Sequence, residues 1–105
     1  MSNNNTPQAN DCLHLLFNYH NDCVRDCLVQ LGVGDSLVLL NTGVLLLLEP
    51  AWMDELPHGI TVYAIEADVQ AHGLAEIQAT TGSVLIGDVA WARLVMTHAH
   101  CLSWK

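Results

Sequence analysis

Short apolar runs separated by polar loops predict five β-strands along the chain. Residues 12–17 and 36–41 are almost unbroken in apolar character, as strands of a buried parallel sheet should be. Residues 60–65 combine β-branched and aromatic side chains, which favour a strand. Two shorter apolar runs, 83–87 and 101–104, predict the last two strands.

Amphipathic stretches between these runs predict helices. In residues 22–31, apolar side chains recur at i, i+3, i+4 and i+7 and share one face: Val24, Cys27, Leu28 and Leu31. Either Asn21 or Asp22 can cap this helix by accepting free backbone N–H groups, and Gly32 and Gly34 end it.

Three further segments predict helical structure, and a fourth fits either a strand or a helix. Residues 66–74 predict a short helix, and residues 50–56 predict a helical turn that begins with proline. Residues 88–98 predict a helix capped by Asp88, with these side chains mostly inward: Val89, Ala92, Leu94 and Met96. The run 43–48 is apolar all round, so it fits a strand or a buried helix equally well.

Strands that alternate with helices predict an α/β fold. We expect one small domain over residues 12–105, with a mainly parallel sheet of about five strands flanked by helices. The preceding residues, 1–11, are rich in asparagine and are predicted to be a disordered extension. Sites in such sheets lie at the carboxyl ends of strands, so the loop 18–22 is a candidate position.

The composition indicates a protein that binds other proteins rather than nucleic acid. Hydrophobic residues make up 51% of the chain and charged residues only 13%, about half the usual share. So much apolar sequence in a small domain predicts exposed apolar surface, and therefore a subunit of an oligomer. The net charge of −8, with three basic residues, leaves no patch for a phosphate backbone, so any RNA must be held by another subunit.

The sequence also predicts a cytoplasmic protein. The N-terminus is polar and lacks the basic and apolar regions of a signal peptide, and the longest apolar run is too short to span a bilayer. Thiols stay reduced in the cytoplasm, so the four cysteines are not expected to form a disulfide framework.

Cys23 and Cys27 are the candidate functional residues, because two of the four cysteines lie four residues apart on one predicted helix. They could be packing residues, since free cysteine is commonly a small buried hydrophobe. They could also be a redox pair, although the spacing is not Cys-x-x-Cys and rarely meets disulfide geometry. With His98 and His100 they could form a tetrahedral zinc site if the two segments met, but we expect no metal and no cofactor.

A sulfur-carrying role needs a thiolate, whose formation depends on nearby charge. Cys23 lies nearer the helix N-terminus, where the helix dipole favours an anion. Arg25 is the nearest cation, whereas Asp22 and Asp26 oppose ionisation. The local charges therefore favour an activated thiol only weakly, and Cys23 more than Cys27.

Four segments, taken in order, resemble the DsrH/TusB-like proteins, which are the smallest subunits of bacterial sulfur-relay complexes. They are "LH" in the first strand, "GDSLVLLNTGV" at 34–44, "VYAIEADVQAHGL" at 62–74 and "WARLVMTHAHCLSW" at 91–104. The likeness covers residues 12–105. It implies a DsrE-like α/β fold and assembly with two homologous sister subunits (TusC/TusD-like or DsrE/DsrF-like) into a heterohexamer, which hands sulfur to a downstream carrier protein.

The resemblance also implies a function. In the TusB-like branch, the complex passes persulfide sulfur toward 2-thiouridine at the tRNA wobble position, and the principal sulfur-carrying cysteine belongs to a sister subunit. This chain would then have mainly an assembly role. Some DsrH-type members carry a cysteine in the first helix before the glycine that precedes the second strand, and "CLVQLGVGDSLVLL" places Cys27 there. Cys27 is therefore the first candidate for an auxiliary persulfide acceptor, and Cys23 the second.

Two other functions stay open from the sequence. One is a DsrH-type subunit in oxidative sulfur metabolism, with Cys27 as a working persulfide carrier. The other is a self-assembling structural protein without sulfur chemistry. Three further residues are expected to be packing or interface groups: His14, Trp91 and Trp104.

Overall fold

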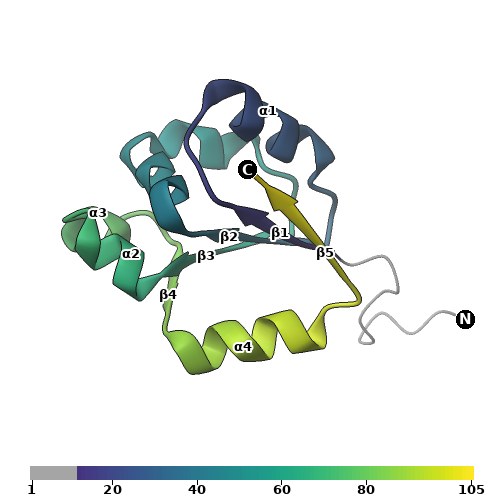
Figure 1. The fold of residues 1–105 in the computed structure, drawn as a ribbon. Helices are drawn as coiled ribbons and strands as arrows, with labels where there is room; N and C mark the ends of the chain where they lie inside the picture. The colour runs from purple at the N-terminus through teal and green to yellow at the C-terminus, as the bar shows by residue number, and fades with distance from the viewer. Residues whose placement is uncertain (1–11) are drawn as a thin grey trace, which may run out of the picture.

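A five-stranded, wholly parallel sheet forms the centre of the computed structural model, which describes residues 12–105 (Figure 1). The strand order is β4-β3-β2-β1-β5. The strands are β1 (Cys12–Leu16), β2 (Ser36–Leu39), β3 (Thr61–Ile65), β4 (Val84–Ile86) and β5 (His100–Trp104). The predicted α/β architecture is thus confirmed, while the extension predicted for residues 1–11 lies outside the described residues.

Burial falls from the middle of the sheet to its edges. Every residue of β1 and β2 is buried, which explains why these strands read as apolar runs. In the edge strand β5, four of the five residues are exposed and only Trp104 is partly covered. Because β5 pairs in parallel with β1, Trp104 lies opposite Leu16 at the carboxyl end of both strands.

Most helices cover one face of the sheet. This layer consists of α1 (Asn21–Gln30), the 3-10 helices η1 (Asn41–Leu48) and η2 (Pro50–Glu55), and α2 (Glu66–Ala71) (Figure 1). Their apolar side chains form the larger core with the sheet, around the residues Leu16, Cys27, Leu39, Leu47 and Val69. The inward face predicted for α1 is confirmed, because Cys27 and Leu31 are buried and Val24 and Leu28 pack against this core. The helix starts after His20 and has no side-chain cap, so the capping predicted for Asn21 or Asp22 is wrong.

The opposite face of the sheet is covered by α4 (Asp88–Thr97) (Figure 1). Leu13, Leu15 and Val38 form a second, smaller core there, against which Trp91 and Leu94 of α4 pack. The inward position predicted for Val89, Ala92 and Met96 is wrong, because all three are exposed. A helix that lies alone on a sheet turns only a narrow stripe inward, here at the i, i+3 spacing of Trp91 and Leu94.

Two further helical segments, η1 and α3 (Ala75–Ala79), lie where the sequence predicted no definite element. The apolar run 43–48 lies within η1, so its helical alternative is correct. This helix passes so close to β1 that a Cβ atom on Gly43 would collide with the Leu16 carbonyl oxygen, which requires glycine at this position. The short helix α3, which follows α2, is not among the predicted elements.

Candidate functional site

A pocket of about 440 Å³ opens at the carboxyl edge of the sheet, where β1 and β5 end and α1 begins. The predicted site loop 18–22 forms one wall, and Asn18 orders it by accepting a hydrogen bond from the His20 N–H at 3.1 Å. The pocket is lined by Asn18, His20, Asp22, Cys23, Asp26, Ser103, Trp104 and Lys105.

The two candidate cysteines differ in access. Cys23 lines this pocket and is partly exposed. Cys27 lies one turn further along α1 and is fully buried in the larger core, with an exposed fraction of 0%. Burial, with smaller contributions from Cys23 and Cys12, raises the pKa of the Cys27 thiol to about 12. In this conformation Cys27 is therefore a covered, protonated thiol, whereas Cys23 is accessible from solvent.

Charged side chains around Cys23 have both signs. Asp22 and Asp26 come from α1, as the sequence suggested, and bring two negative charges to the pocket. Lys105 lies across the pocket, and its Nζ sits 5.1 Å from the centroid of the Phe17 ring, a cation–π contact. Arg25 lies on the other side of α1 and does not line this pocket.

Trp104, which forms a wall of the pocket, is held by a chain of buried polar groups. Its indole Nε1–H donates to Nδ1 of His14 at 3.1 Å, and the two rings are nearly parallel, with 12° between their planes. An indole N–H only donates, so Nδ1 must be unprotonated and the proton of neutral His14 lies on Nε2. Nε2 then donates to Asp35 Oδ2 at 2.9 Å.

Asp35 is the buried acceptor at the end of this series of hydrogen bonds. Its carboxylate also accepts the backbone N–H groups of Cys12 and Gly32, each at 3.0 Å. Burial opposes ionisation, but the hydrogen bonds from Gly32, His14 and Cys12 outweigh it and hold the pKa of Asp35 below its ordinary value. The carboxylate thereby ties together the start of β1, the end of α1 and the start of β2.

The four cysteines Cys12, Cys23, Cys27 and Cys101 are all free. Within residues 12–105, no three side chains of histidine, cysteine, aspartate or glutamate come together as metal ligands, so Cys23, Cys27, His98 and His100 do not form the zinc site drawn from the sequence. The pocket around Cys23 also places a histidine, His20, and a lysine, Lys105, at the same edge of the sheet.

Comparison with known proteins identifies the class. The family model described as DsrH like protein matches residues 18–101. Protein TusB from Enterobacter sp. (strain 638) is 32% identical over 88 residues, which cover 82% of this chain and 90% of that protein. The solution NMR structure of protein Tm0979 from Thermotoga maritima superposes with a TM-score of 0.57 at 27% identity, covering 80% of this chain and 91% of that one.

The chain therefore belongs to the DsrH/TusB-like family, and its role is that of a sulfur-relay subunit. Subunits of this kind work in multi-subunit complexes. None of the helices in the described part of the chain is long and apolar enough to cross a membrane.

Sequence reasoning placed Cys23 and Cys27 on one helix but missed the His14–Asp35 pair. His14 was expected to be a satisfied core or interface group, which its two hydrogen bonds confirm. Asp35 lies within the motif at 34–44, where its sequence neighbours do not mark it as a buried acid. A histidine inside an apolar strand is the one signal that could have prompted a search for a buried acidic partner.

Proposed function

We propose that this chain is a cytoplasmic subunit of a relay that passes persulfide sulfur toward 2-thiouridine at the tRNA wobble position. Its main role is assembly with TusC/TusD-like sister subunits in a heterohexamer that passes sulfur on to a carrier protein. The tRNA branch is favoured over oxidative sulfur metabolism by the similarity to a protein named TusB over 90% of that protein's length. A subunit so poor in basic residues leaves RNA binding to other members of the complex.

The observation that supports an assembly role is the exposed apolar surface of α4. Val89 and Met96 are 75% and 84% exposed, and their seven-residue spacing places them on one side of the helix. Exposed apolar side chains grouped in this way are typical of protein interfaces. Burial of this side of α4 against a sister subunit would stabilise the complex.

The test is to measure association of the chain with its sister subunits by light scattering and titration. We expect Val89→Glu and Met96→Glu each to weaken association roughly tenfold, because a charge would be buried in the interface. Val33→Glu is the matched control, since Val33 is 77% exposed and lies in the loop after α1. Association that is unchanged in both α4 variants would exclude α4 as the interface.

Within this relay we propose Cys23 as the auxiliary sulfur acceptor. Its thiolate attacks the terminal sulfur of a donor persulfide, the new Cys23–sulfur bond forms as the donor sulfur–sulfur bond breaks, and the donor leaves as a thiolate. The support is access, because Cys23 lines the pocket at the carboxyl edge. The corresponding role of Cys27 stays a prediction that requires α1 to move away from the core.

Intact-mass spectrometry tests this proposal after incubation with a persulfide-loaded cysteine desulfurase and its acceptor protein. We expect one added sulfur atom on the wild-type chain and on Cys27→Ser, and none on Cys23→Ser. Loss of the added sulfur in Cys27→Ser alone would assign the role to Cys27. No added sulfur on any of them would restrict the chain to assembly.

A further inference from the structure

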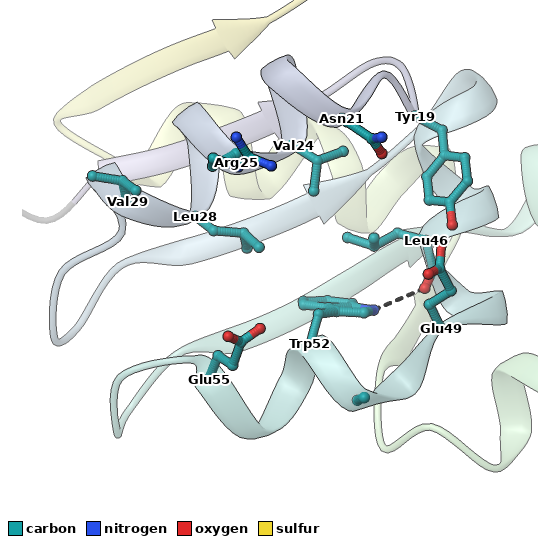
Figure 2. A pocket seen from close by; sticks show the side chains of 11 residues that line it. Tyr19, Asn21, Val24, Arg25, Leu28, Val29, Leu46, Glu49, Trp52 and Glu55 are labelled. Carbon is teal, nitrogen blue, oxygen red and sulfur yellow. Dashed lines mark hydrogen bonds between the residues drawn. The ribbon is translucent and has the colours of Figure 1, made fainter.

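A second hollow of the molecule, a groove of about 560 Å³, lies between α1 and the 3-10 helix η2 (Figure 2). It shares no residue with the Cys23 pocket, because the two hollows lie on different sides of α1. Its floor is apolar and consists of Val24 and Leu28 from α1, with Leu46 and Trp52 from the 3-10 helices. The Trp52 indole is fixed there by a 2.8 Å hydrogen bond from Nε1–H to the Leu46 carbonyl.

Two carboxylates flank this floor. Trp52 and Glu55 lie three residues apart in η2, and a 3-10 helix has three residues per turn, so they share one side of the helix. Glu49, three residues before Trp52, is the residue that precedes η2 and lines the same groove. Figure 2 shows the two glutamates on either side of the indole. Both are exposed, and within residues 12–105 neither forms a salt bridge. Arg25 on the opposite wall is the one basic residue among those lining the groove, whose net charge is negative.

The dimensions restrict what can lie in the groove. Six residues of 3-10 helix rise roughly 12 Å, which is the approximate separation of the two carboxylates along the groove. Four residues of an extended chain advance about 13 Å, which matches this separation, whereas four residues of an α-helix advance only about 6 Å.

We propose that this groove binds an extended segment of a partner protein that carries a basic, an apolar and a basic side chain at alternate positions. Alternate residues of an extended chain point to the same side, and positions i and i+4 are separated by about 13 Å. The two basic side chains then meet Glu49 and Glu55 while the apolar side chain between them contacts Trp52 and Leu28. Charge complementarity with a chain of net charge −8 favours such a basic partner.

The test uses the full chain and the synthetic peptide acetyl-Gly-Arg-Gly-Leu-Gly-Arg-Gly-amide. The indole N–H signal of Trp52 in the NMR spectrum, assigned with Trp52→Phe, reports binding at the floor of the groove. We expect saturable shifts at millimolar peptide. Binding should weaken about two- to fivefold in Glu49→Gln or Glu55→Gln, the range typical of single exposed ion pairs. A peptide with glycine in place of leucine should bind more weakly still.

Asp54→Asn is the matched control, because Asp54 is an exposed acid of the same 3-10 helix that does not line the groove. Its affinity should stay within twofold of the wild type. Equal weakening in Asp54→Asn and Glu55→Gln would reduce the effect to general charge attraction and overturn the proposal. Equal binding of a peptide with adjacent arginines, or of a helical peptide, would overturn the extended geometry, and no shift of the Trp52 signal would overturn the site itself.

Discussion

Replacement of Asp35 by asparagine is expected to destabilise the fold strongly, although it changes a single atom of the side chain. The carboxylate accepts three hydrogen bonds: from the Cys12 N–H and the Gly32 N–H at 3.0 Å and from His14 at 2.9 Å. An amide has one oxygen, so at least one of these donors would face an NH₂ group instead of an acceptor. His14 cannot relieve the conflict by changing tautomer, because its Nδ1 must accept the Trp104 N–H.

The expected magnitude follows from the burial of the site. The Asp35 side chain is only 10% exposed. One unsatisfied buried donor costs about 1–3 kcal/mol, and the remaining hydrogen bonds also lose the assistance of the charge. We therefore predict a loss of about 2–4 kcal/mol in the free energy of unfolding, a large part of the stability of a domain of this size.

Urea unfolding followed by circular dichroism measures this loss. The midpoint should fall while the m-value stays unchanged, as for a variant that keeps its fold. Asp54→Asn, on the exposed surface of η2, makes the same chemical change and should stay within about 0.5 kcal/mol of the wild type. A loss for Asp35→Asn that matched this control would refute the assignment of Asp35 as a buried anion with three donors.

Three further predictions concern the pH dependence of the Asp35 contribution, the close approach at Gly43 and the two thiols of α1. The difference in stability between the wild type and Asp35→Asn should shrink as the pH falls from 6 toward 3. The pKa of Asp35 is depressed in the folded state, so its carboxylate stabilises the fold above the unfolded pKa of about 3.9, and that contribution is lost as the pH falls through the folded pKa. A difference that stayed constant would mean that Asp35 does not titrate. Gly43→Ala should lower the urea midpoint sharply or prevent folding, because the new Cβ would collide with the Leu16 carbonyl oxygen. Gly73→Ala should lower the midpoint much less, because the new Cβ has open space around it and the only cost is the strain of an alanine at positive φ. Iodoacetamide should modify Cys23 well before Cys27 in the native protein, since one thiol is accessible and the other is buried with a raised pKa; equal rates at both sites would show that α1 opens readily.

The sequence predicted the sheet well because its central strands are buried on both faces. Their apolar runs leave little choice at β1 and β2, and the five strands lie close to the predicted positions. The run in η1 could not be assigned in the same way, because periodicity does not distinguish a strand from a helix that is apolar all round. Its place is decided by tertiary packing, in which Val44 and Leu47 enter the larger core.

The outward face of α4 was wrongly predicted for a related reason. Its apolar residues lie on more than one side of the helix, and the sequence cannot show that a single helix covers that face of the sheet. Val89 and Met96 were assigned to the core on hydrophobicity alone, yet the structure leaves them exposed. For a subunit, an interface residue and a core residue have the same appearance in one sequence.

The sequence predicted the helix that carries the two cysteines but not the other side of the pocket. The spacing of Cys23 and Cys27 placed both on α1, but the pocket also needs the end of β5, which is brought there by the pairing of Leu16 with Trp104. The difference in burial between the two thiols depends on how α1 rests on the sheet. Position in the family motif favoured Cys27, whereas access favours Cys23.

Sulfur transfer through a reconstituted complex tests the central claim most directly. The sister subunits, a persulfide donor and the downstream sulfur-carrier protein would be combined with and without this chain, and the carrier would be followed by intact-mass spectrometry. We predict that the chain joins the sister subunits in one complex and that sulfur reaches the carrier much faster when the chain is present. A chain that remains monomeric beside its sister subunits, with equal transfer in its presence and absence, would contradict its role as a relay subunit.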